Sequence, residues 1–68
     1  MKFPVIDYDN SLFLILMIDG DDYIHCVTKD GELDVIGMAS YNMPLDEALP
    51  QEGFNIVKHQ TLKEFLEC

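Results

Sequence analysis

The chain has 68 residues, which suffices for one small domain over 1–68 and is too short for a two-domain enzyme, a Rossmann fold or a (β/α) barrel. It carries 13 acidic residues against four lysines, with a formal net charge of −9. Nucleic acid and anionic lipid repel such a charge, so neither is expected as a direct partner. Because 49% of the residues are apolar, the sequence is not that of a disordered acidic tail.

The first third of the chain has the pattern of two β-strands and a turn. Residues 3–6 are apolar around Pro4, which suits the start of a strand or an edge strand. Residues 7–11 are polar turn residues, and residues 12–18 are apolar without interruption. An apolar run of seven residues is too short to span a bilayer as a helix, and it predicts a buried strand.

Two Asp-Gly pairs then punctuate runs of β-forming residues. Residues 19–22 and 29–32 each contain such a pair, and glycine tolerates the positive φ of a hairpin turn. The turns separate residues 12–18, 23–28 and 33–39. This spacing predicts an antiparallel meander of three strands.

After Ser40 the pattern changes to short helices around one more strand. Residues 42–50 predict one or two helical turns, with proline and acidic residues at the start and Pro50 as the stop. Residues 54–59 predict a last strand. Thr61 is placed to cap a C-terminal helix, with Glu64 as its capping-box partner.

The C-terminal helix is predicted to be amphipathic. Leu62, Phe65 and Leu66 fall at spacings that place them on one face. The complete pattern predicts an α+β domain that is mainly antiparallel β. Four or five strands with a short C-terminal helix form either a small sheet or a partly open, SH3-like barrel.

The strand over residues 12–18 is apolar on both faces. Side chains alternate along a strand, so even-numbered residues face one way and odd-numbered residues the other. The odd-numbered apolar residues are Phe13, Ile15 and Met17. Two interpretations follow: a central strand buried inside the monomer, or an interface formed by these three residues with a partner or a second copy.

Acidic residues gather at the predicted turns. The group that we assign to partner binding comprises Asp19, Asp21, Asp22, Asp30, Glu32 and Asp34. One hypothesis is a surface that imitates nucleic-acid phosphates and occupies the basic cleft of a partner protein. The alternatives are solvated turns that keep the domain soluble, and a cation site at residues 19–22, which lack the spacing of an EF-hand loop.

The residues with catalytic or metal-binding side chains are sparse. His25 and Cys26 are adjacent, so in a strand they point to opposite faces and cannot easily bind one metal or act as a pair. The thiols of Cys26 and Cys68 are expected to be free in a reducing, cytoplasmic setting. The chain has no glycine-rich phosphate loop, no serine-histidine-aspartate order and no arginine. We expect no catalytic residues, no metal and no cofactor.

These observations favour a non-enzymatic binding protein. The leading hypothesis is an acidic interaction module that regulates or inhibits a basic partner, in particular one that acts on nucleic acid. The alternative is a homo-oligomeric structural or assembly subunit, of which a homodimer is the simplest, with residues 12–18 at the interface. A metal-dependent or thiol enzyme is the third and weakest class.

Overall fold

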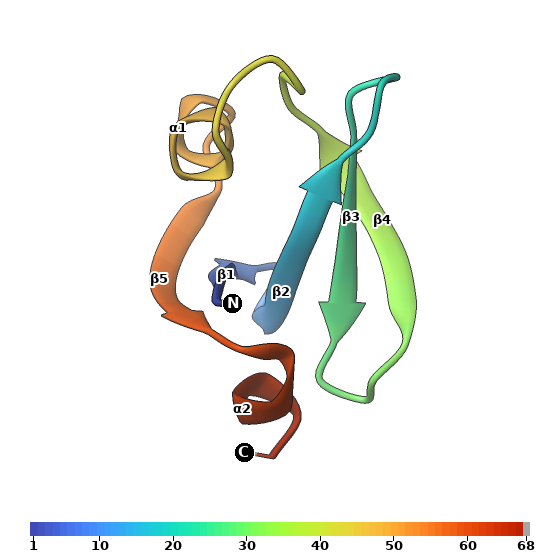
Figure 1. Cartoon of the computed structure of the whole chain (residues 1–68), viewed down its shortest axis with the longest axis vertical. Coiled ribbons are helices and arrows are strands. Elements are labelled where there is room, and N and C mark those ends of the chain that lie inside the picture. The colour runs from blue at the N-terminus through green and yellow to red at the C-terminus, as the bar shows by residue number, and fades with distance from the viewer. Residues whose placement is uncertain (68) are drawn as a thin grey trace.

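The computed structural model describes residues 1–67, which form one five-stranded antiparallel sheet and two short helices. The strands are β1 (Phe3–Tyr8), β2 (Ser11–Ile18), β3 (Tyr23–Thr28), β4 (Leu33–Met38) and β5 (Asn55–Gln60). Their order across the sheet is β4-β3-β2-β1-β5, so β2 lies at the centre (Figure 1). The predicted α+β class is confirmed, and of the two predicted forms the open sheet is the one that occurs, with β4 and β5 as its edges.

Tight turns connect the first four strands. Tyr8 pairs with Ser11 across Asp9 and Asn10, which have φ values of 53° and 62°. Two consecutive residues with positive φ are typical of a type I′ hairpin, whose twist matches that of the strands. Gly31 in the β3–β4 turn has φ 85°, as its Asp-Gly pair predicts.

The β2–β3 turn forms where the sequence predicts it, but a different residue adopts the positive φ and a side chain holds the turn. Gly20 does not adopt a positive φ; Asp22 does, at 69°. The Oδ1 atom of Asp19 accepts hydrogen bonds from the backbone N–H groups of Asp21 and Tyr23, at 2.8 and 3.0 Å. An aspartate that binds its own turn in this way fixes the chain reversal without a glycine conformation.

A β-bulge in β2 changes which side chains share a face. Ile15 pairs with Cys26, whereas Met17 pairs with the next residue back along β3, His25. Leu16 is therefore the extra residue, and the alternation shifts by one position after it. As a result Ile18 packs in the same cluster as Phe13 and Ile15, while Met17 lies on the other face. The predicted strict alternation over residues 12–18 is wrong beyond Leu16.

The helix α1 (Leu45–Gln51) covers one face of the sheet. Its Ala48 and Leu49 are buried with Ile6, Ile15 and Ile24. The sequence predicts that this helix stops at Pro50, but Pro50 lies inside the helix. The helix ends instead through N–H groups of residues 52–54 that bind carbonyls of Leu49 and Pro50, with Gly53 at φ 87°. Pro50 has no backbone N–H, so it removes one hydrogen bond from this helix of seven residues.

The helix α2 (Leu62–Glu67) packs on the opposite face through one side chain. The predicted capping box is confirmed, since Thr61 N–H donates to Glu64 and Glu64 N–H donates to the Thr61 hydroxyl, at 2.8 and 3.1 Å. Phe65 is fully buried against Val5 and Leu14. In residues 1–67 there is no helix long and apolar enough to cross a bilayer.

The predicted apolar stripe of α2 is only partly buried. Leu62 and Leu66 are 41% and 42% exposed, whereas Phe65 is at 0%. Phe65 is therefore the contact that holds the C-terminal helix to the sheet. The other two leucines flank that contact and stay accessible.

We expect Phe65→Ala to lower the free energy of unfolding by about 3 kcal/mol, because it removes a fully buried aromatic ring and leaves a cavity. Leu62→Ala in the same helix should cost less than about 1 kcal/mol, because Leu62 is largely exposed. Urea denaturation of both variants measures the difference. Equal effects would show that α2 is not part of the core.

Candidate functional site

The two faces of the sheet are covered unequally. On the face toward α1, Ile6, Ile15, Ile24 and Cys26 form a continuous core that β1, β2 and β3 share with this helix. On the other face, α2 covers β1 and β2 through the contacts of Phe65 with Val5 and Leu14. The β3–β4 half of that second face has no helix over it in residues 1–67.

Apolar side chains line this uncovered half. We call it the open face and define it by five exposed residues, Met17, Tyr23, Leu33, Val35 and Met38. Paired residues on neighbouring strands point to the same side, and so do alternate residues along one strand. Met17 and Val35 both pair with His25, and Tyr23, two residues before His25, pairs with Met38. Leu33 is two residues before Val35. Five exposed apolar side chains on neighbouring strands form a patch, and such patches on small proteins mark interaction surfaces.

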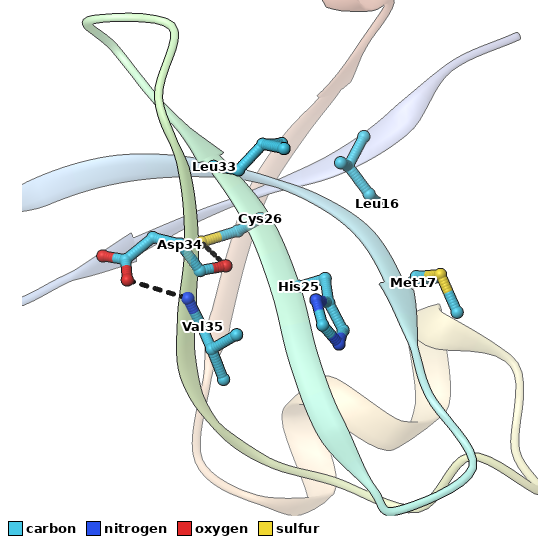
Figure 2. Close-up of a pocket in the computed structure, with 7 residues that line it drawn as sticks. All are labelled: Leu16, Met17, His25, Cys26, Leu33, Asp34 and Val35. Carbon is cyan, nitrogen blue, oxygen red and sulfur yellow. Dashed lines mark hydrogen bonds between the residues drawn. The ribbon is translucent and has the colours of Figure 1, made fainter.

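The open face is hollowed at its centre. A pocket of about 300 Å³ is lined mainly by Leu16, Met17, His25, Leu33 and Val35. Figure 2 shows His25 between Val35 of β4 and Met17 of β2. This volume is at the lower limit for small-molecule sites and is large enough for an apolar side chain of a partner.

The structure does not bring Phe13, Ile15 and Met17 together as one interface. Ile15 is fully buried in the monomer and Phe13 packs beside it toward α1. Met17 lies on the open face and is 51% exposed. The bulge at Leu16 separates them, so of the three residues Met17 is the one available to another chain.

The acidic residues that the sequence assigned to one surface fall into two groups. Asp19, Asp21 and Asp22 lie at the β2–β3 turn, whereas Asp30 and Glu32 lie at the β3–β4 turn. These turns are at opposite ends of β3, a strand of six residues, and therefore about 20 Å apart (Figure 1). Asp34 is on β4, where its Oδ1 accepts the N–H of Val35 at 2.8 Å (Figure 2).

Three acidic residues of and beside α1 join the first group. Figure 1 shows α1 and the β2–β3 turn at the same end of the molecule, opposite α2. Asp22 and Glu52 line one shallow pocket, and the Asp22 carboxylate accepts the N–H of Tyr41, which ties the turn to the loop before α1. We call this region the acidic end; it comprises Asp19, Asp21, Asp22, Asp46, Glu47 and Glu52.

None of the four lysines lies in the β2–β3 turn or in α1. Lys63 is in α2, Lys2 is close enough to Glu64 to lower the pKa of that carboxyl, and Lys58 is in the second half of β5, which leads to α2. Lys29 donates to the Phe65 carbonyl and lies 4.4 Å from the centre of that ring. The β2–β3 turn and α1, which form the acidic end, therefore contain no lysine, and the basic side chains that contact its carboxylates are His25 at Asp19 and His59 at Asp46.

Sequence reasoning did not find α1 as part of this charge cluster. The sequence pattern places Asp46 and Glu47 in the first turn of a helix and Glu52 in a turn. Their approach to the β2–β3 turn depends on the long connection from β4 across the end of the sheet. No local sequence signal indicates this arrangement, because it depends on the positive φ of Asp22 and on the hydrogen bond that its carboxylate accepts from Tyr41.

Asp19 is held by its neighbours in the ionised form. The His25 ring donates to its Oδ2 at 2.6 Å. This hydrogen bond, and next the one from the Tyr23 N–H, hold the pKa of the Asp19 carboxyl below its ordinary value of 3.8. The pair joins the acidic end to the open face, because His25 lies at the centre of that face.

A second histidine is paired in the same way. His59 of β5 donates to the Asp46 carboxylate of α1 at 3.0 Å. Both histidines thus contact one carboxylate each and lie on different elements. Residues 1–67 contain no group of three or more histidine, cysteine or acidic side chains placed to hold a metal ion.

Cys26 is a core residue. Its side chain is fully buried, and its Sγ–H donates to the Asp34 carbonyl at 3.5 Å (Figure 2). Burial, and next the nearby Asp34 charge, raise the pKa of the Cys26 thiol to about 11. A thiol in this environment is a poor nucleophile. Cys26 is free, as predicted, and Cys68 lies outside the described residues.

No protein-family model, no curated protein and no solved structure matches this chain.

We expect Asp19→Asn to destabilise the protein at neutral pH and to lose this effect in acid. Because the folded pKa of Asp19 is depressed, its stabilisation is present above 3.8 and disappears as the pH falls through the lower folded value. Unfolding free energies from pH 7 to 2 measure the gap to the wild type. Asp21→Asn in the same turn is the control; a gap that persists in acid would contradict the assignment.

In a Cys68→Ser chain, Cys26 should react with a disulfide reagent about 100-fold more slowly when folded than when unfolded. The reason is a thiol pKa near 11 in place of the ordinary 9.0, which leaves about 100-fold less thiolate. Absorbance at neutral pH follows the reaction, with and without urea. Equal rates would place Cys26 at the surface.

Proposed function

We propose that this protein is a non-enzymatic interaction module that regulates or inhibits a basic partner, in particular one that acts on nucleic acid. The observation that carries the proposal is the acidic end, where two separate segments that carry six carboxylates lie at the same end of the molecule (Figure 1). A surface of one sign focuses its field and steers an oppositely charged partner toward it.

The density of charge fits a partner that normally binds nucleic acid. The molecule is 30 Å long and its net charge is −9. One strand of duplex DNA carries a charge every ~3.4 Å, and thus about nine charges over the same length. Averaged over its length, the molecule thus carries about as many net negative charges as one DNA strand.

The side chains capable of chemistry support binding over catalysis. Cys26 is buried with a raised thiol pKa, and each histidine is engaged by a single carboxylate at the surface. The alternative function, an assembly subunit with β2 at the interface, has Met17 as its available contact, because Leu14 and Ile15 are fully buried.

Capture from a lysate of source cells tests the proposal. The tagged protein is used as bait with nuclease added, and bound proteins are eluted by stepwise increases in salt. We expect a basic protein that elutes at moderate salt, because a complex held by exposed charges is screened by ions. Recovery of untagged copies of the same chain, resistant to salt, would favour the assembly subunit.

The triple variant Asp21→Asn, Glu47→Gln, Glu52→Gln tests the acidic end directly. Asp19 and Asp22 are left intact because their carboxylates hold backbone N–H groups. Losing three exposed charge pairs of up to ~1 kcal/mol each should weaken partner binding about tenfold or more.

The matched control removes the same charge elsewhere. Asp7→Asn, Asp30→Asn and Glu67→Gln together change three exposed carboxylates outside the acidic end. Isothermal titration with the captured partner compares both variants with the wild type. If the two triple variants lose affinity equally, the acidic end has no special role and the proposal fails in this form.

A further inference from the structure

The uncovered half of the sheet is the least explained feature of the molecule. A domain of this size normally buries the apolar side chains of its sheet, yet Met17, Tyr23, Val35 and Met38 are each about half exposed and Leu33 is 79% exposed. Exposed side chains of this kind next to a 300 Å³ apolar pocket are typical of a surface that another element covers.

We propose that the open face binds one amphipathic helix of the partner, which carries leucine- or methionine-like side chains on one side and lysine or arginine on its flanks. This inference rests on the proposed function, because it specifies how the basic partner is held. The helix lies beside α2 and completes the second layer over the sheet.

The spacing of the sheet fits a helix in this place. Phe65 of α2 sits on Val5 and Leu14, and therefore over the β1–β2 pair. The β3–β4 pair is centred two strand spacings away, at about 9.6 Å for spacings of ~4.8 Å. Helices that pack side by side have their axes 8–10 Å apart, roughly the same distance. A helix centred on β3 and β4 would thus lie next to α2, whose Leu66 already reaches the β3–β4 turn.

The side of α2 toward the β3–β4 turn carries an exposed leucine. Leu66 is 42% exposed, and its Cδ2 lies 3.9 Å from the position that a Cβ on Gly31 would occupy. Leu66 is therefore directed toward the β3–β4 turn and forms a wall of the open face. A helix of about 13 residues matches the ~20 Å length of the six-residue strand β3.

Charge selects a cationic occupant. Asp19 contacts His25, which lies in the open face. Asp34 pairs with the core residue Cys26, and its carboxylate extends outward from edge strand β4 at the border of this face (Figure 2). Glu32 lies in the β3–β4 turn, next to Leu33. Lys29, in the same turn, is engaged by the Phe65 carbonyl and ring. An apolar surface with carboxylates at its border is complementary to an amphipathic helix with basic flanks.

The edge of the sheet favours binding on the face over addition of a strand. The N–H of Val35 in edge strand β4 already donates to Asp34 at 2.8 Å. A carboxylate that occupies an edge donor obstructs pairing with a further strand. Pairing of a partner's strand with the edge strand β4 is thereby disfavoured, whereas the side chains of the open face remain available for contact.

The test uses the full chain with labelled methyl groups and a synthetic peptide of leucine and lysine. The peptide has about 14 residues with leucine at helical spacing, so that one side is apolar over roughly the length of β3. A second peptide of the same composition alternates leucine and lysine and cannot form an apolar helix face. We expect the first peptide to shift the methyl signals of Met17, Leu33 and Val35 and to bind more tightly than the second.

Two valines provide a matched pair of variants. Val35 on edge strand β4 is 47% exposed, and Val57 on edge strand β5 is 46% exposed. Val35→Lys should weaken peptide binding about tenfold or more, because it places a charge in the apolar contact, whereas Val57→Lys should change it less than about twofold. Leu33→Lys, at a side chain 79% exposed, repeats the test if Val35→Lys unfolds.

The outcomes separate this inference from the proposed function. Equal effects of Val35→Lys and Val57→Lys, or equal binding of the two peptides, overturn the helix site. A stable dimer of the free protein that Val35→Lys dissociates also overturns it and assigns the open face to a second copy. Partner binding that is weakened at the acidic end but not by Val35→Lys overturns the helix site and leaves the proposed function intact, whereas partner binding that neither change affects overturns both.

Discussion

Strand β2 is apolar on both faces, and this constraint organises the molecule. Leu14 and Ile15 are adjacent in sequence, fully buried, and packed in two different clusters on opposite sides of the sheet. A strand of this kind needs cover on both sides. The chain supplies this cover with two helices of seven and six residues, each too short to be stable unless it docks.

The cover is adequate on one side and partial on the other. Helix α1 buries Ala48 and Leu49 against three strands, whereas α2 buries Phe65 against two. In the part of the chain that the structure describes, no helix covers β3 and β4 on the second side. The open face is thus a consequence of the same constraint that builds the core, and its location follows from where α2 docks.

The strand pattern and the turns could be predicted from the sequence, because local residue preferences determine them. The Asp-Gly pair at Gly31 and the capping box of Thr61 and Glu64 are local signals that the structure confirms. The bulge at Leu16 could not be predicted, since every residue around it is apolar and either register buries side chains. That single extra residue decides that Met17, and not Ile18, reaches the open face.

The candidate site depends on the contacts that local signals do not specify. The sequence identified Asp19, Asp21 and Asp22 as acidic turn residues, but their neighbours Asp46, Glu47 and Glu52 are more than 20 positions away. The Asp22 carboxylate, which accepts the Tyr41 N–H, is one link between the two segments. Grouping by sequence proximity instead joined them to Asp30 and Glu32, which the length of β3 keeps apart.

The net charge and the open face have opposite effects on self-association. An uncovered apolar surface on a small protein promotes self-association, and a charge of −9 on every copy opposes it. In the proposed function the same charge would attract a cationic protein, and apolar contacts at Met17, Leu33 and Val35 would determine how long it stays bound. In the proposed function, a surface that repels its own copies and attracts the opposite charge would discriminate between partners before any contact is made.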